Sequence, residues 1–379
     1  MKIVVSGVGI NSCLGGTQET WGKMSLGLSG IKLAQPFPCL PLLPVGLIDV
    51  APSDIKTLTL SLVEQTLADA RLVPPLVDTA VVVGSSRGCQ GRWEVLAREY
   101  LKNNNFSFDW LDTFPCQPSQ VTAQYIQCFA SVFAPMAACA TGLVAIAQGY
   151  ELIKQGHCQR VIAGAVETPI TPLTIVGFQQ MKALAHKGCY PFAKEREGMV
   201  LGEGGAMLVL ETEELALSRG AKIYGEILGW GMSCDGLGMT APEVSARSAI
   251  EAIKRCLNHS NLGFKDIDHI QTHGTATTLN DAREAQIIAK LFPHLPKVNH
   301  TKGSVGHTLG GSSAIALALT LISLREQKLL ANNHQYPPQY NLNWVKQTEA
   351  YNFRNSLCFS FGFGGQNAVV ALQKSTVNG

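Results

Sequence analysis

Short apolar runs rich in valine and isoleucine recur along the chain between segments with helical spacing. They cover residues 3–5, 79–83, 160–165, 207–210 and 269–272. Runs of this length without polar alternation are typical of strands buried on both faces, which occur when helices cover both sides of a sheet. The pattern therefore predicts an α/β protein.

Two segments are predicted to be central helices. Residues 140–155 are apolar around the whole helical circumference except for Glu151, Lys154 and Gln155. A helix with this pattern belongs inside a protein rather than at its surface. A second strand, turn and apolar helix follow from Val298 to residues 313–324. One buried helix in each half of the chain predicts a duplicated α/β core.

A charged stretch at residues 213–220 separates the two halves. It has the character of a short exposed helix that ends at Gly220, a residue common just after a helix. We therefore expect an N-terminal half at residues 1–215 and a C-terminal half at residues 216–379. Near the end of the chain, residues 357–361 and 367–372 are predicted to be two strands joined by a glycine-rich turn.

Composition narrows the possible partners. Only 15% of the 379 residues are charged, too few to cover a monomer of this size, which predicts a buried interface between subunits. The net charge of +2 without a long basic run argues against nucleic-acid or membrane-surface binding.

Residues 129–150 are apolar enough to suggest a membrane span, but Pro135 and Gly142 favour a buried strand, turn and helix. Eleven scattered cysteines and a short N-terminal apolar run predict reduced thiols in the cytoplasm.

Cys139 is the first candidate for chemistry. It precedes the predicted helix 140–155, and a thiol at a helix N-terminus lies at the positive end of the macrodipole. That position favours the thiolate, which is the nucleophilic form. The alternative is an ordinary small buried cysteine, one of eleven in the chain.

Two histidines and a lysine are further candidates. His273 follows a predicted strand and precedes glycine and hydroxyl residues, and His307 lies in a similar glycine-rich segment. Lys302 is an isolated positive charge five residues before His307, and it needs a carboxylate partner if it is buried. The alternatives are structural histidines and a solvated loop lysine.

Taken together, these segments resemble the β-ketoacyl-acyl-carrier-protein synthases, condensing enzymes with the thiolase-like fold. The resemblance is carried by motifs that occur in the same order over most of the chain: residues 138–142, 191–192, 197–198, 202–204, 273–275, Asn280-Asp281 with Glu284, Lys302 with Gly306-His307, and residues 361–365. It implies two similar halves in a layered α-β-α-β-α core.

The resemblance also implies roles for individual residues. Cys139 would be the nucleophile, His273 and His307 the partners that drive decarboxylative condensation, and Lys302 with Glu284 a supporting charged pair. The backbone N–H groups of Cys139 and Phe363 would hold the acyl oxyanion. Phe363 would also gate the acyl pocket, and Thr275 and Thr277 would bind the pantetheine arm of an acyl carrier protein.

It further implies a homodimer that takes acyl and malonyl groups from acyl carrier protein and needs no metal or other cofactor. The chain departs from the family pattern in places. Gly311-Ser312-Ser313 replaces an alanine-rich run, and residues 133–136 replace a longer glycine-proline entry before Cys139. The second departure affects the floor of the acyl pocket and the dimer interface.

Other functions stay open on the same fold. A specialised acyltransferase would use the thioester without decarboxylation, and a non-condensing partner subunit of a ketosynthase heterodimer would lack the nucleophile that Cys139 supplies. Thiolases carry a second cysteine where this chain has Phe363, and starter-unit enzymes pair cysteine with histidine and asparagine.

Gly7-Val8-Gly9 suggests the start of a dinucleotide fingerprint, but the third glycine is misplaced.

Overall fold

The computed structural model describes residues 1–104, 108–333 and 335–376. Eleven strands of these residues form one sheet in the order β12-β10-β9-β14-β15-β8-β1-β7-β6-β4-β5. The first half of the chain contributes β1 (Ile3–Ser12), β4 (Ala80–Gly84), β5 (Val132–Phe133), β6 (Arg160–Glu167) and β7 (Gly204–Thr212). The second half contributes β8 (Gly225–Cys234), β9 (His269–Gln271), β10 (Lys297–Asn299), β14 (Asn355–Gly362) and β15 (Gln366–Gln373), with β12 (Asn343–Trp344) at the edge.

The two sets of strands have the same topology. Apart from the added edge strand β12, the third strand of each set in chain order lies at the outside, followed by the second, fourth, fifth and first. The pairings also correspond, because β4 and β6 are parallel like β9 and β14, while β6 and β7 are antiparallel like β14 and β15. Antiparallel pairing of β1 with β8 joins the halves. The structure thus confirms the predicted duplication.

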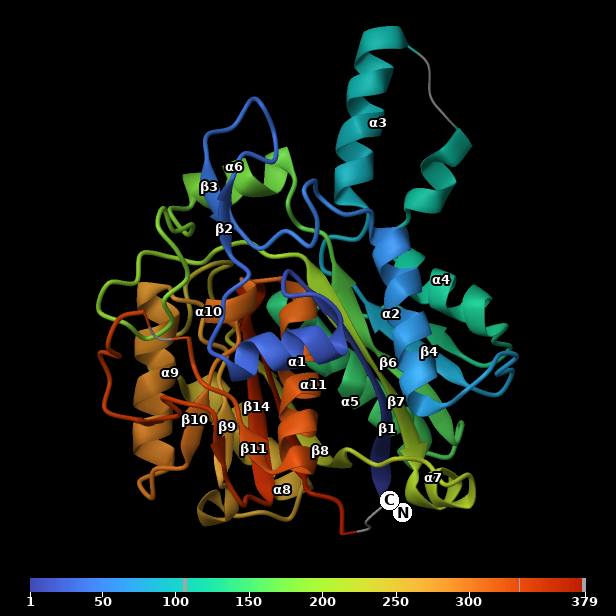
Figure 1. Cartoon of the computed structure of the whole chain (residues 1–379), viewed down its shortest axis with the longest axis vertical. Coiled ribbons are helices and arrows are strands. Elements are labelled where there is room, and N and C mark those ends of the chain that lie inside the picture. Colours follow the sequence, from blue (N-terminus) through green and yellow to red (C-terminus); the bar gives the residue numbers. More distant parts are fainter. Residues whose placement is uncertain (105–107, 334, 377–379) are drawn as a thin grey trace.

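Helices lie in three layers around these strands (Figure 1). The helices α2 (Ile55–Ala70) and α4 (Gln117–Ile126) cover the outer face of the first half. The helices α8 (Arg247–His259) and α9 (Thr278–Leu291) share a hydrophobic core with the strands of the second half. Between the halves lie α5 (Thr141–Lys154) and α11 (Gly310–Glu326), in the middle of the largest hydrophobic core. This is the α-β-α-β-α arrangement that the resemblance implied.

The central helices are in close contact at Gly142. A Cβ atom built on Gly142 would lie 2.5 Å from the backbone N of Ala314 and 2.8 Å from Oγ of Ser313. Only glycine therefore permits this distance between α5 and α11. Because both helices touch at their first turns, the segments that precede them, one from each half, lie side by side.

Further helices and strands complete the fold. They are the helices α1 (Thr17–Ser25), α3 (Gln90–Asn103), α6 (Pro172–Gln180), α7 (Glu213–Ser218) and α10 (Lys302–Val305), and the strand pairs β2 (Lys32–Ala34) with β3 (Leu43–Val45) and β11 (Lys328–Leu329) with β13 (Glu349–Ala350). The 3₁₀ turns are η1 (Phe108–Thr113), η2 (Ala138–Ala140), η3 (Phe264–Asp266) and η4 (Phe363–Gly365). In Figure 1, α3 stands out from the body of the molecule.

The predicted strands and central helices are present with bounds shifted by a few residues. The expected division at residue 215 stays a prediction, although β7 ends at Thr212 and β8 begins at Gly225. Gly7 and Gly9 lie inside β1 rather than after a strand. The helix α2 packs directly against them, and a Cβ on Gly9 would be 2.2 Å from Oγ1 of Thr66. These glycines serve helix packing, and a phosphate loop is not formed there.

The segment 129–150 differs in part from its prediction. It contains β5, the turn η2 and most of α5, but both residues of β5 are exposed at the edge of the sheet rather than buried. Of the helices in the described residues, none is long and apolar enough to cross a membrane.

Candidate active site

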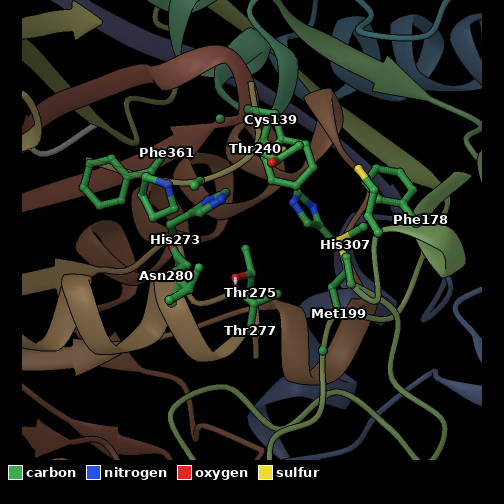
Figure 2. Close-up of a pocket in the computed structure, with 18 of the residues that line it drawn as sticks. Cys139, Phe178, Met199, Thr240, His273, Thr275, Thr277, Asn280, His307 and Phe361 are labelled. Atoms are coloured by element: carbon green, nitrogen blue, oxygen red, sulfur yellow. Dashed lines mark hydrogen bonds between the residues drawn. The ribbon is translucent and has the colours of Figure 1, made fainter. Parts of the chain in front are cut away.

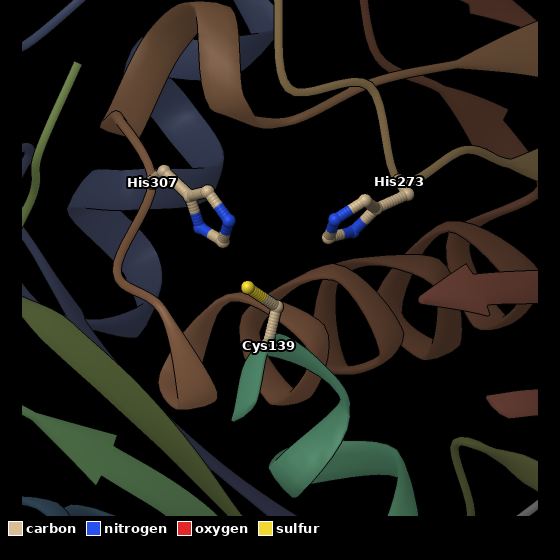
Figure 3. Close-up of side chains that lie close together, drawn as sticks. All are labelled: Cys139, His273 and His307. Atoms are coloured by element: carbon tan, nitrogen blue, oxygen red, sulfur yellow. The ribbon is translucent and has the colours of Figure 1, made fainter. Parts of the chain in front are cut away.

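Three side chains from separate segments meet where the two halves join. Cys139 lies in the turn η2, directly before α5. His273 follows the end of β9, and His307 lies between α10 and α11. The sulfur of Cys139 and the ring nitrogens available from the two histidines lie within 4.8 Å of one another. Figure 3 shows both imidazoles directed toward the thiol. The structure therefore brings together the three residues that the sequence singled out.

The backbone around Cys139 is held in a demanding conformation. Ala138 has a φ of 46°, in the left-handed region that L-residues rarely adopt. The hydroxyl of Ser360 donates a hydrogen bond of 3.0 Å to the carbonyl oxygen of Cys139. A Cβ on Gly362 would lie 3.1 Å from the backbone N of Cys139, so a side chain at this position would crowd the backbone of Cys139. The contact places η4, with Phe363, beside the thiol.

The ionisation of Cys139 differs from the prediction. Burial raises the pKa of the Cys139 thiol to about 11, against the positive charge of Lys302 and the backbone N–H of Phe363, which both favour the anion. The helix terminus was expected to favour a thiolate, but the Cys139 side chain is buried, and a buried anion is poorly solvated. The resting site therefore holds a thiol, and the expected resting thiolate is wrong.

Lys302 and Glu284 both act on His273. The Lys302 ammonium donates to the carbonyl oxygen of His273 and lies 3.3 Å from its Nδ1. The carboxylate of Glu284 accepts from the backbone N–H of His273 at 2.6 Å and from that of Gly274 at 2.9 Å. Lys302 and Glu284 are therefore linked through their separate contacts with His273, and not by a direct hydrogen bond between ammonium and carboxylate.

Burial shifts the titration of these groups. It raises the pKa of Glu284 to about 7, although the two N–H donors favour the carboxylate. It lowers the pKa of Lys302, while Cys139 in its thiolate form and the Glu284 carboxylate favour the ammonium. Burial and the charge of Lys302 also hold the pKa of His273 and of His307 well below their usual range. Both imidazoles are therefore neutral at pH 7. Each carries one N–H group that can donate a hydrogen bond.

Cys139, His273 and His307 line a pocket of about 320 Å³ that opens to the surface. Figure 2 shows these three side chains among the residues that line it. Thr275 and Thr277 lie on its wall, with their hydroxyl oxygens 2.8 Å apart. Phe363 also lines the pocket, and its ring centroid is 6.1 Å from that of Phe178. The residues implied for the pantetheine arm and for the acyl gate thus share one pocket with Cys139, while their roles stay predictions.

Ligand atoms for a metal ion converge at the same place. In the parts of the chain that the structure describes, Cys139, His273 and His307 form the one group of cysteine, histidine and acidic side chains whose donor atoms could meet on an ion. The nearby charge of Lys302 opposes a cation in this position.

Comparison with known proteins agrees with the geometry. Residues 53–216 match the profile of the β-ketoacyl synthase N-terminal domain, and residues 224–336 match that of the C-terminal domain. Together these matches cover well over half of the chain. The chain belongs to the β-ketoacyl synthase family.

Curated members of the family align over part of their length. The 3-oxoacyl-[acyl-carrier-protein] synthase 2 of Synechocystis sp. is 38% identical over 249 residues, which are 62% of this chain and 60% of the relative. The protein of the same name from Mycobacterium bovis is 37% identical over 253 residues, 64% of this chain and 61% of the relative. The aligned part therefore spans about three fifths of these relatives.

Solved structures of ketosynthases share the whole fold. A type II PKS ketosynthase in complex with its acyl-carrier protein matches with a TM-score of 0.93 at 24% identity, and a β-ketoacyl synthase from Burkholderia phymatum with 0.90 at 23%. Each match covers 99% of both chains. At this identity the likeness shows the fold alone, which is the thiolase-like fold that the sequence predicted.

Within this synthase fold, sequence reasoning missed residues that support the site. Asp281 lies in the first turn of α9, which begins at Thr278. The buried carboxylate of Asp281 accepts from the backbone N–H of Phe192 at 2.7 Å and from that of Thr275 at 3.1 Å. The Asn280-Asp281 motif marked this position, but its partner 89 residues away was not readable from the pattern.

Arg283 also lines the pocket and was not predicted. Its guanidinium donates to Asp235 at 3.1 Å and to Asn367 at 3.0 Å, and it lies 5.2 Å from the ring centroid of Phe361. It thereby ties α9 to the segments that follow β8 and η4. A lone arginine in an amphipathic helix carries no sequence signal for such a contact.

Proposed function

We propose that this chain is a β-ketoacyl-acyl-carrier-protein synthase that extends an acyl group held on Cys139. One observation carries the proposal: a thiol and two neutral imidazoles converge within 4.8 Å in a pocket that opens to the surface. A thiol suits transfer of a thioester, because the acyl group passes from sulfur to sulfur with little change in free energy. Neutral imidazoles suit the stabilisation of an anion that forms later.

In the first step, the sulfur of Cys139 attacks the thioester carbonyl of an acyl carrier. The new C–S bond replaces the carrier's C–S bond, and the carrier leaves as its thiol with the proton of Cys139. The negative charge that develops on the carbonyl oxygen needs hydrogen-bond donors. The backbone N–H groups of Cys139 and Phe363 are proposed for this role, since η4 packs against the backbone at Cys139.

In the second step, a malonyl carrier loses carbon dioxide. The electrons of the broken C–C bond form an enolate. Its oxygen accepts hydrogen bonds from the N–H groups of His273 and His307. The enolate carbon then attacks the acyl carbonyl on Cys139, a C–C bond forms and the C–S bond breaks. The sulfur leaves with the bonding electrons and takes a proton from the solvent. Each donor to the developing anion is worth about 3 kcal/mol. The balanced products are a ketoacyl carrier, carbon dioxide and the free thiol.

The proposal needs no metal or organic cofactor. Neither step needs an external oxidant or reductant, and N–H donors stabilise each oxyanion. The substrates would arrive on the pantetheine arm of acyl carrier protein, with Thr275 and Thr277 as partners of its amide groups. Their mutual hydrogen bond of 2.8 Å leaves one hydroxyl proton free to donate into the pocket.

The proposed homodimer is supported by the edge of the sheet. The edge strand β5 exposes Val132 and Phe133, and Phe129 and Met136 beside it are 88% and 63% exposed. A flat apolar strand edge is an aggregation site unless another strand covers it. Phe133→Lys should therefore halve the mass measured by light scattering, whereas Val244→Lys, at a position 94% exposed, should leave it unchanged.

We also propose a reducing compartment such as the cytoplasm. All eleven cysteines belong to the described residues, and they are free thiols. Disulfides are the usual result of an oxidising compartment in a cysteine-rich chain.

Intact-mass measurement tests the proposal. Incubation with acyl carriers of graded length should add one acyl group to the protein, and Cys139→Ala should abolish this addition without unfolding the chain. His307→Ala should still acquire the acyl group but should lose malonyl decarboxylation. Retained acylation in the Cys139 variant would refute the nucleophile. Acylation without condensation in the unmodified protein would instead favour the specialised acyltransferase, and no acylation at all would favour the non-condensing partner subunit.

A further inference from the structure

The two active-site histidines are held by different partners at Nδ1. The Nδ1 of His273 faces the ammonium of Lys302 at 3.3 Å. The Nδ1 of His307 faces the hydroxyl oxygen of Ser312 at 3.0 Å. Ser312 lies in the first turn of α11, five residues after His307, and is 2% exposed. It belongs to the Gly311-Ser312-Ser313 segment, which departs from an alanine-rich run in the family.

The contact at His273 defines its tautomer. An ammonium group has three donors and no acceptor, so Nδ1 of His273 must be the ring nitrogen without a proton. The single proton of this neutral imidazole is then on Nε2. His273 therefore presents an N–H group at the end of the ring opposite Lys302.

The hydroxyl of Ser312 can impose the same tautomer on His307. Its oxygen accepts the backbone N–H of Thr308 at 2.8 Å, which occupies one lone pair. Its proton has two acceptors in reach, Nδ1 of His307 at 3.0 Å and Oγ1 of Thr308 at 3.2 Å. The Thr308 hydroxyl can itself donate to the second lone pair of Ser312. In that arrangement all three groups are satisfied, and the Ser312 proton goes to the imidazole.

We propose that Ser312 is a positioning residue whose hydroxyl donates to Nδ1 of His307 and holds that imidazole as the Nε2–H tautomer. The Nε2–H group then faces the cavity shared with Cys139 and His273, where Figure 3 shows the two rings converging. The two histidines thus present equivalent donors, one enforced by an ammonium and the other by a hydroxyl. Their ring centroids are 5.5 Å apart, close enough to serve one oxyanion.

The catalytic consequence rests on the proposed function. Without the Ser312 hydroxyl, the Nδ1–H tautomer is no longer excluded, and it presents a bare nitrogen to the enolate oxygen. Losing one oxyanion donor outright slows a reaction by about 10²- to 10³-fold. Because only part of the His307 population would change tautomer, Ser312→Ala should slow condensation by about 10- to 100-fold. Acylation of Cys139 should stay within about twofold, since its oxyanion is assigned to backbone N–H groups.

Ser313 offers a matched control in the same helix. Its buried hydroxyl accepts the backbone N–H of Leu143 at 3.2 Å, whereas the hydroxyl at Nδ1 of His307 belongs to Ser312. Ser313→Ala removes the same atoms from the adjacent residue and should leave condensation near the wild-type rate. A loss common to both variants would assign Ser312 a structural role and overturn the proposal.

Nitrogen NMR of protein labelled at the histidine ring nitrogens tests the tautomer directly, with His307→Asn used to assign the signals. The wild-type protein should show Nε2–H at His307, and Ser312→Ala should show a mixture or the Nδ1–H form. A wild-type Nδ1–H tautomer, or an unchanged spectrum in Ser312→Ala, would refute the proposal. This readout needs no substrate. If the tautomer shifts as expected while no protein condenses acyl groups, Ser312 keeps its role and the proposed function fails.

Discussion

The substitution Gly142→Ala tests whether the contact between α5 and α11 sets the geometry of the active site. The added Cβ would lie 2.5 Å from the backbone N of Ala314, where an ordinary contact needs 3.4 Å. The atom that it meets is backbone, which cannot turn away as a side chain could. We therefore expect the two helices to separate by about 0.9 Å at their first turns.

Two effects follow from that separation. Overpacking costs about 1–3 kcal/mol, offset in part by the better helix propensity of alanine, so the free energy of unfolding should fall by about 1–2 kcal/mol. Cys139 precedes α5 and His307 precedes α11, so the thiol and imidazole should move apart with the helices. A misplacement near 1 Å can slow a reaction by about 10²-fold. The proposed condensation should therefore slow far more than the stability loss alone explains.

Equilibrium urea unfolding and the condensation rate of pre-acylated protein measure the two effects. Gly22→Ala is the matched control, because this glycine lies in α1 and its added Cβ meets nothing within 4 Å. It should gain up to about 1 kcal/mol of stability and keep its activity. Wild-type condensation in Gly142→Ala, whatever its stability, would refute the claim that this glycine sets the spacing of the site.

Three further predictions concern charge. Because burial raises the pKa of Cys139 to about 11, alkylation of this thiol should quicken about tenfold per pH unit above pH 7; a plateau near neutral pH would reveal a resting thiolate instead. Lys302→Met removes a charge that favours the thiolate, so the same alkylation should need a higher pH, and an unchanged profile would contradict this effect. Burial would raise the pKa of Glu211, but bonds from Arg219 and Arg160 outweigh it and lower that pKa. Glu211→Gln should therefore cost about 3 kcal/mol of unfolding free energy near neutral pH, and less as acid protonates the native carboxylate; equal losses at pH 7 and in acid would exclude this cause.

The predictions that succeeded from sequence depend on short stretches of chain. The circumference of the helix at residues 140–155 is apolar, and the helix α5 (Thr141–Lys154) lies in the middle of the protein. The order of Cys139, His273 and His307 within glycine-rich motifs identified the family, and the three side chains meet in the structure. Such features can be read locally because hydrophobic periodicity and motif order survive without knowledge of contacts.

The tertiary structure decided what depends on partners distant in the chain. The ionisation of Cys139 follows from how completely the two halves enclose it, and burial there outweighs the helix terminus that the sequence emphasised. Asp281 was noted as part of a motif, but its hydrogen bond from Phe192 joins residues 89 positions apart in the chain. Ser312 lies close to His307 in sequence, yet only folded coordinates place its hydroxyl 3.0 Å from Nδ1. Solvent exclusion and hydrogen-bond geometry are set by segments that meet only when the chain is folded, and they have no signature in a local pattern.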